Sequence, residues 1–187
     1  MALHNILILI HLIGISLLSV GIGSIVMVVL VSGRVETNQD AVTTIGWLLR
    51  ISPVFGIASL LILASGIWMG IRYDLFGQAW LIGSLLVFIS TAATGNLIHS
   101  RRLVNAAKLA GEQPVGPISP EVRAALHDRV LRTSLFIDTC LFVALLFLMS
   151  SRPELVGVII TIVAAIVVGS LLSLALQPRS SVAAVSS

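Results

Sequence analysis

The chain contains 187 residues, of which 57% are hydrophobic and only 10% are charged, and its mean hydropathy is +1.10. Ordinary soluble domains carry roughly 25% charged residues, so this composition excludes that class and predicts a protein whose solvent is lipid. The net charge of +3 does not indicate nucleic-acid binding, because the basic residues lie between apolar segments and form no patch interleaved with aromatic residues.

Five apolar segments are long enough to cross a bilayer, since about 20 residues of helix span a hydrocarbon core of about 30 Å. They cover approximately residues 5–31, 51–70, 79–98, 133–149 and 154–176. Helices are expected because lipid offers no partner for unpaired backbone groups and the sequence shows no alternating strand pattern. The predicted fold is all-α: one polytopic bundle of five spans over residues 1–176, with a flexible tail at 177–187.

Lysine and arginine are distributed unevenly among the connections between these segments. Nine of the 11 lie in the first connection, the third connection and the tail, whereas Arg72 and Arg152 lie in the second and fourth. Basic residues accumulate on the cytoplasmic side of membrane proteins. This bias predicts a bacterial cytoplasmic (inner) membrane protein whose N-terminus lies outside and whose C-terminus lies in the cytoplasm.

The third connection, residues 99–132, is the most polar internal part of the chain. Good helix formers flank the segment GEQPVGPIS, whose glycines and prolines interrupt both helices. Ser119 is an expected N-cap with Pro120 at the first helical position, and we expect that second helix to run straight into the fourth span. The pattern predicts that spans three and four extend into the cytoplasm as a helical hairpin. It is either a solvated connector or a docking surface for a membrane or cytoplasmic protein or for anionic lipid.

The fifth span carries a small residue at every fourth position. This spacing lines one helical face with little side-chain bulk, so a neighbouring helix can approach closely. The predicted packing residues are Gly157, Thr161, Ala165, Gly169 and Ser173. The preceding SRPE segment predicts a capping box, in which Ser151 and Glu154 exchange hydrogen bonds with backbone donors.

His11 interrupts the first apolar segment and is expected at outer-leaflet depth. A neutral imidazole in lipid needs partners, and a hydroxyl on another span, Ser65 or Ser150, would satisfy one nitrogen. Alternatively, His11 is a haem or copper ligand, with His4 as a second metal ligand near the outer surface and Met149 as a soft donor. Both interpretations stay open at this point, and no cofactor is firmly predicted.

A second polar group is expected at the opposite leaflet. Asp138 lies in the fourth span, and Asn96 and His99 lie at the end of the third span at a similar predicted depth. A carboxylate in lipid requires polar or basic neighbours. The basic candidates are Arg50, Arg101, Arg102 and Arg132. The group is interpreted as a structural ion pair or hydrogen-bonded latch between spans three and four, or as a proton relay or anion site.

Four segments carry a family resemblance: IHLIGISLLSVG, GIWMGIRYDLFGQAW, NLIHSRR and DRVLRTSLFIDTCLFVALLFLM. Together they resemble a family of uncharacterised bacterial integral membrane proteins that carry a domain of unknown function. More distantly, a histidine followed by a glycine in the first span is similar to membrane proteins of the copper-resistance protein D type. The resemblance implies a membrane protein in which His11 and Gly14 are the positions to inspect.

The sequence shows no catalytic motif of the hydrolase, metalloprotease, P-loop or dinucleotide-binding kind. A single cysteine, Cys140, excludes an intrachain disulfide and a cysteine-based metal cluster. The leading interpretation is a noncatalytic accessory subunit or scaffold in contact with membrane lipids. The alternatives are haem or copper handling through His11, and a small-solute or proton pathway involving Asp138.

Overall fold

The computed structural model describes residues 2–31 and 35–176, and within these ranges the chain is helical, without a β-strand. Its elements are α1 (Ala2–Val31), α2 (Asn38–Arg72), α3 (Ala79–Thr94), the π-helix η2 (Gly95–Ser100), α4 (Arg101–Glu112), α5 (Pro120–Leu126), α6 (Arg129–Ser151) and α7 (Leu155–Ala175). Five stretches are long and apolar enough to span a membrane: Leu3–Val31, Asn38–Arg72, Ala79–Glu112, Pro120–Ser151 and Leu155–Ala175. The predicted all-α bundle with five spans is confirmed.

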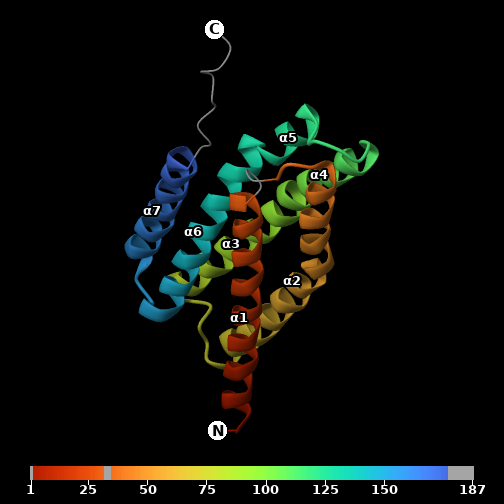
Figure 1. Cartoon of the computed structure of the whole chain (residues 1–187). Helices are drawn as coiled ribbons and strands as arrows, with labels where there is room; N and C mark the ends of the chain where they lie inside the picture. The colour runs from red at the N-terminus through yellow and green to blue at the C-terminus, as the bar shows by residue number, and fades with distance from the viewer. Residues whose placement is uncertain (1, 32–34, 177–187) are drawn as a thin grey trace.

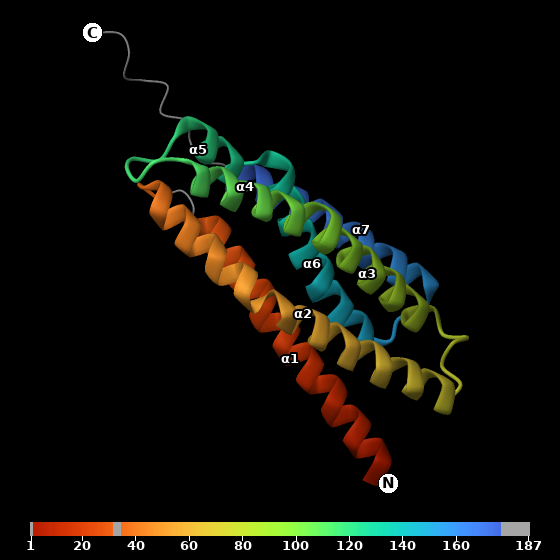
Figure 2. The same cartoon turned by 90° about the vertical axis from the view of Figure 1, so that its right-hand side faces the viewer.

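The helices form two layers. The long α1 and α2 pack along each other as a hairpin, while α6 packs against both α3 and α7. Figure 2 shows α1 and α2 on one side of the molecule and α3, α6 and α7 on the other. In Figure 1, α1 begins at the bottom and α7 ends at the top, as an odd number of spans requires. The assignment of the top to the cytoplasm stays a prediction, and Arg34, Arg179 and the predicted tail lie outside the described residues.

Small residues let α1 and α2 approach closely. A Cβ atom added at Gly14 would lie 3.1 Å from the carbonyl oxygen of Ala58 and 2.8 Å from Cγ1 of Ile62. Both distances are shorter than ordinary van der Waals contacts, so a larger residue would push the two helices apart. Gly14 therefore fixes the spacing of the hairpin.

In the second layer, the small residues of α7 lie against α6 over part of their length. A Cβ added at Gly169 would meet the backbone of Ile137 at 2.6 Å, and Ser173 shares a hydrogen bond of 2.7 Å with Thr133. Ala165 is buried in a cluster to which α2, α3, α6 and α7 contribute. At the other end, Gly157 lies against Pro153 of its own turn, and Thr161 donates to the Gly157 carbonyl at 2.7 Å.

The expected boundaries differ from the observed ones where polar residues cap or extend a helix. α2 begins at Asn38 rather than near residue 51, because Thr37 caps it by accepting a hydrogen bond from the backbone N–H of Asp40 at 3.1 Å. Ser119 caps α5 as expected, by accepting from Val122 N–H at 3.3 Å. The expectation that α5 runs straight into the fourth span is wrong. Asp128 accepts from two backbone N–H groups and starts α6 as a separate helix.

The expected capping box before α7 is also wrong. Ser151 still belongs to α6, and its hydroxyl donates to the Phe147 carbonyl at 2.7 Å. Arg152 then reverses the chain with a left-handed backbone (φ 47°), and the Glu154 side chain makes no capping hydrogen bond. Ser151 therefore lies too early to cap α7. The Arg152 guanidinium lies 5.4 Å from the Trp80 ring centre, a cation–π contact between the α6–α7 turn and the start of α3.

The largest buried cluster of the described residues lies at the end of the molecule formed by α4, α5 and the start of α2, here called the α4–α5 end. Ala41, Ile45 and Val122 are completely buried there. Asn38 joins α2 to the α4–α5 loop, because its side-chain amide donates to the Pro114 carbonyl at 3.1 Å and accepts from Ser119 N–H at 3.0 Å. The two layers are thus held together most firmly at this end.

Candidate functional site: two intramembrane cavities

Two cavities lie between the layers, each bordered by one of the polar groups found in the sequence. The larger, about 390 Å³, is lined by residues of α1, α2, the α3–η2–α4 rod and α6, including Asp138 and His99, and is called the Asp138 cavity. The smaller, about 40 Å³, is lined by His11 with residues of α2, α3 and α6, and is called the His11 cavity. The two polar groups thus occupy separate places in the bundle.

A π-helical segment presents His99 to the Asp138 cavity. η2 replaces the α-helical pattern between Thr94 and Arg101, in the middle of the continuous Ala79–Glu112 rod. A π-turn bonds residues five apart, so it rotates the following side chains relative to an α-helix, and such segments are frequent at functional sites. The His99 side chain is buried, and its residue also borders the cavity.

The carboxylate of Asp138 is only partly satisfied by the protein. The Thr94 hydroxyl donates to Oδ2, and Nε2 of His99 lies 3.6 Å from the same oxygen. Among the described residues, no hydrogen bond reaches Oδ1, and this atom is not among the fully buried polar atoms. Since Asp138 borders the cavity with 14% of its side chain exposed, Oδ1 is open to the cavity.

The hydrogen bonds of Ser134 indicate which nitrogen of His99 carries a proton. Ser134 lies 3.1 Å from Nε2, and its own hydroxyl donates to backbone carbonyls one turn earlier in α6. When the Ser134 hydroxyl donates to one of these carbonyls, its oxygen accepts from the imidazole, and Nε2 of His99 then carries the hydrogen. A neutral His99 satisfies this arrangement and brings no positive charge to Asp138.

Within the described residues, none of the arginines expected around Asp138 forms an ion pair with it. Arg102 forms an ion pair with Asp128, and Asn96 donates to the Ala92 carbonyl at 3.0 Å. Arg132 has a buried Nε atom without a hydrogen-bond partner. Spans three and four are therefore joined here by the Thr94–Asp138 and His99–Ser134 hydrogen bonds, and within the described residues no arginine ion pair contributes.

In the His11 cavity, the imidazole bonds across the hairpin. Nδ1 of His11 lies 3.0 Å from the Ser65 hydroxyl, so Ser65 rather than Ser150 is the cross-helix partner. Ser65 donates its own proton to the Leu61 carbonyl, which indicates that Nδ1–H of His11 is the donor. Gly66 leaves room for the ring, since a Cβ there would lie 3.2 Å from Cε1. Within the part of the chain that the structure describes, no hydrogen bond reaches Nε2 of His11.

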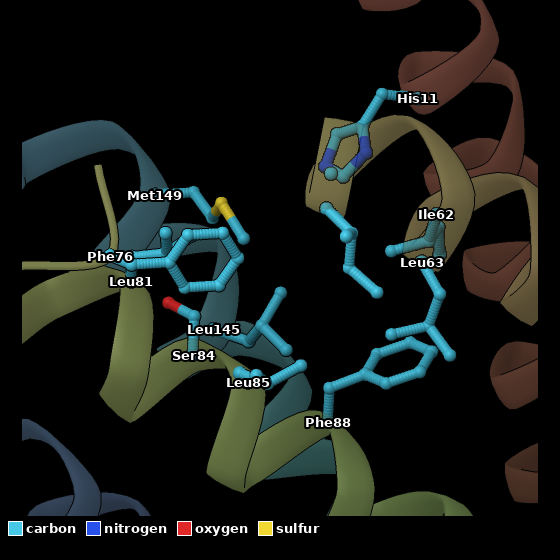
Figure 3. Close-up of a pocket in the computed structure, with 12 residues that line it drawn as sticks. His11, Ile62, Leu63, Phe76, Leu81, Ser84, Leu85, Phe88, Leu145 and Met149 are labelled. Atoms are coloured by element: carbon cyan, nitrogen blue, oxygen red, sulfur yellow. The ribbon is translucent and has the colours of Figure 1, made fainter. Parts of the chain in front are cut away.

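Apolar side chains surround the rest of the His11 cavity. Figure 3 shows His11 extending from α1 toward the space bordered by Phe76, Phe88 and Met149. His4 lies elsewhere: its Nδ1 is 2.7 Å from the Tyr73 hydroxyl, and the two rings are in edge contact. Seven residues of helix separate His4 from His11 by about 10 Å. The structure does not bring them to one point, and the described residues hold no group of three His, Cys, Asp or Glu suited to a metal.

Sequence reasoning missed Thr94, Ser134 and the π-helix. Hydroxyl residues are common in these spans, and most of them donate to the carbonyl four residues earlier, as Ser84 and Thr139 do. Thr94 therefore carries no distinguishing sequence signal. The aromatic side chains of Phe55, Phe88 and Phe142, which also line the Asp138 cavity, were equally inconspicuous among other apolar residues.

Comparison with known proteins agrees with this architecture. A family model described as a predicted integral membrane protein (DUF2269) matches residues 5–153, most of the chain. The chain therefore belongs to this family of integral membrane proteins. No curated protein and no solved structure gives a significant match to the chain.

Proposed function

We propose that this DUF2269 protein binds a small solute in the Asp138 cavity. The observation that supports the proposal is a carboxylate oxygen that no hydrogen bond from the described residues reaches, beside a cavity of about 390 Å³ between membrane-spanning helices. Ligand sites in proteins have volumes of about 300–1,000 Å³ and combine apolar walls with a few polar groups. Ionisable residues inside a membrane commonly mark such sites.

A purely structural role explains this geometry less well. Holding α3 to α6 needs only a neutral hydrogen-bond pair, whereas an ionised carboxylate in an apolar setting carries a large desolvation cost. A latch also has no use for Oδ1, which the described hydrogen bonds leave open. A bound solute would supply a partner for the open oxygen Oδ1 and, when Asp138 is ionised, for its charge.

Filling the cavity tests the proposal. Gly56 borders the Asp138 cavity and has no atom within 4 Å of an added Cβ, so Gly56→Phe should occupy the binding space without displacing a helix. Gly46 lies on the same helix with equally open surroundings but does not border the cavity, so Gly46→Phe is the matched control.

Both variants and the unchanged protein would be reconstituted in nanodiscs. Equilibrium dialysis would then measure the binding of three aromatic probes: cationic tetraphenylphosphonium, neutral triphenylphosphine oxide and anionic tetraphenylborate. At least one probe should bind saturably above empty nanodiscs and lose about tenfold in affinity with Gly56→Phe alone. Equal binding by the two variants, or no saturable binding of any probe, would show that the proposal is wrong.

The role of accessory subunit or scaffold stays a prediction. The buried cluster at the α4–α5 end supports it, because it gives the residue 99–132 hairpin a defined shape against α2. Replacing the exposed α4 residues Arg101 and Lys108 by glutamate should abolish copurification of a stable partner if this surface docks one. Unchanged recovery of the partner would exclude the surface.

Haem or copper binding at His11 also stays a prediction. An Nε2 atom that no hydrogen bond from the described residues reaches, with Nδ1–H held by Ser65, is the arrangement of a metal-binding histidine, and Met149 borders the same cavity. A Soret band or stoichiometric copper that disappears with His11→Leu would support this role. A cofactor retained by His11→Leu would exclude it.

A further inference from the structure

Charge decides which solutes suit the Asp138 cavity. Of the residues that line it, the ionisable ones are Asp138 and His99, and no Lys or Arg is among them. With His99 neutral, the charge of the cavity is that of Asp138 alone, which is negative when the carboxyl is ionised. A charge in such surroundings requires a partner of opposite sign or a bound proton.

The composition of the wall argues against an inorganic cation as that partner. Magnesium and calcium require about six or more oxygen ligands, supplied by several carboxylates, carbonyls or retained waters. The described residues show no cluster of three acidic or histidine groups, and Asp138 has Thr94 and His99 as its polar neighbours. The other oxygens that line the cavity belong to neutral hydroxyl and amide groups, so a dehydrated divalent ion would have Asp138 as its single carboxylate ligand among the lining residues.

The same wall suits an organic cation. Phe55, Phe88 and Phe142 line the cavity from α2, α3 and α6, together with leucine and isoleucine side chains. Neutral polar residues complete the lining: Ser52, Ser59, Thr91, Asn96, Ser100 and Thr139. Aromatic faces attract cations, and apolar surface accepts a hydrocarbon or aromatic body. One open carboxylate oxygen matches one ammonium-type group. The volume of about 390 Å³ accommodates a body of drug-like size.

We infer that the Asp138 cavity selects lipophilic organic cations, such as hydrophobic amines, with the cationic group at Oδ1 of Asp138 and the apolar body against Phe55, Phe88 and Phe142. This inference rests on the proposed function and specifies its substrate class. Neutral or anionic solutes of similar shape would leave the carboxylate unpaired or place like charges together.

The probe set that tests the cavity also tests this selectivity. Tetraphenylphosphonium should bind at least about tenfold more tightly than triphenylphosphine oxide or tetraphenylborate, because the cation alone gains the attraction of a carboxylate in low dielectric. Asp138→Asn should lower the affinity for tetraphenylphosphonium by about tenfold or more. Asp138→Glu, which keeps the charge, should restore most of it.

Asp74→Asn is the matched control, since it removes the same charge from the exposed turn between α2 and α3, where Asp74 has a left-handed backbone that asparagine also accepts. It should leave tetraphenylphosphonium binding unchanged. If Asp138→Asn does not fold, Phe142→Leu provides a second test, with an expected loss of about threefold for the cation and little change for the neutral probe.

These results distinguish a failure of the proposed solute binding from a failure of the inference about cations. If the neutral or anionic probe binds as tightly as the cation, and Gly56→Phe weakens that binding, the cavity binds solutes but the inference about cations is overturned. Equal cation affinity for Asp138→Asn and the unchanged protein also overturns it. If Gly56→Phe changes the affinity for none of the probes, the proposed function and the inference are both wrong.

Discussion

The α4–α5 end and the middle of the bundle are packed in opposite ways. At the α4–α5 end, four helices contribute to one buried cluster in which Ile45 and Val122 have no exposed surface. In the middle, the same two layers border about 390 Å³ of partly open space beside Asp138. Apolar side chains gain little by leaving lipid, whereas leaving water strongly favours burial. We predict that the α4–α5 end lies outside the bilayer, where water favours close packing of the two layers. Within the bilayer, lipid contacts the apolar side chains equally well, so the layers can remain apart.

The largest loss of stability is expected from shortening a side chain in the buried cluster at the α4–α5 end. Ile45→Ala should lower the free energy of unfolding by about 2–5 kcal/mol, because it leaves a cavity in a fully packed site. Ile22→Ala, at the wall of the Asp138 cavity, should cost less than about 1 kcal/mol, since its surroundings are already open. Thermal and denaturant unfolding in detergent would measure both, and equal losses would contradict the contrast between the two regions.

A somewhat smaller loss of stability is expected from placing a larger side chain at the close contact between α6 and α7. Gly169→Leu introduces a side chain whose Cβ already lies 2.6 Å from the Ile137 backbone, and overpacking of this kind typically costs about 1–3 kcal/mol. The midpoint of thermal unfolding should fall clearly. Gly23→Leu, in open surroundings on α1, is the control and should leave the midpoint within experimental error.

A modest gain in stability is expected at the carboxylate of the cavity. Asp138→Asn removes a partly satisfied charge from an apolar setting while keeping a group that accepts the Thr94 hydrogen bond, so the free energy of unfolding should rise by up to about 1 kcal/mol. Thr94→Val, which removes the hydrogen bond but keeps the charge, should lower it instead. A loss of several kcal/mol with Asp138→Asn would indicate a structural latch rather than a binding group.

The smallest effect is expected at the His11 cavity. His11→Leu exchanges one hydrogen bond with Ser65 for apolar surface of similar size, and these changes nearly cancel, leaving a difference of less than about 1 kcal/mol. Ser65→Ala in the same assay should be less stable than His11→Leu, since it leaves the imidazole N–H without its partner. The reverse order would mean that His11 has a further role in the fold.

Sequence reasoning predicted the class and the spans because both depend on composition over long segments. It misjudged helix ends where a single side chain decides, as with Thr37 at the start of α2 and Asp128 between α5 and α6. It expected arginine near Asp138, yet Arg102 pairs with Asp128. Which carboxylate Arg102 contacts depends on the rotation of η2 and α4 about their helix axis. The hydrophobic periodicity of the sequence does not reveal this rotation.

The polar positions His11, His99 and Asp138 were identifiable because ionisable groups are rare in apolar spans. Which of these residues lie close to one another was only partly predictable from the sequence. The His99–Asp138 distance of 3.6 Å follows from the packing of α6 beside η2. His4 and His11, considered together as possible metal ligands, have different partners. The cavities depend on the spacing between two layers, a long-range property that no local pattern encodes.

An experimentally determined structure of the protein in nanodiscs, solved with tetraphenylphosphonium added, examines the Asp138 cavity most directly. We expect non-protein density between the two layers, with its cationic centre near Oδ1 of Asp138 and its rings against Phe88 and Phe142. Layers closed against each other at this depth, with an arginine such as Arg132 bonded to Asp138, would contradict the proposed binding cavity.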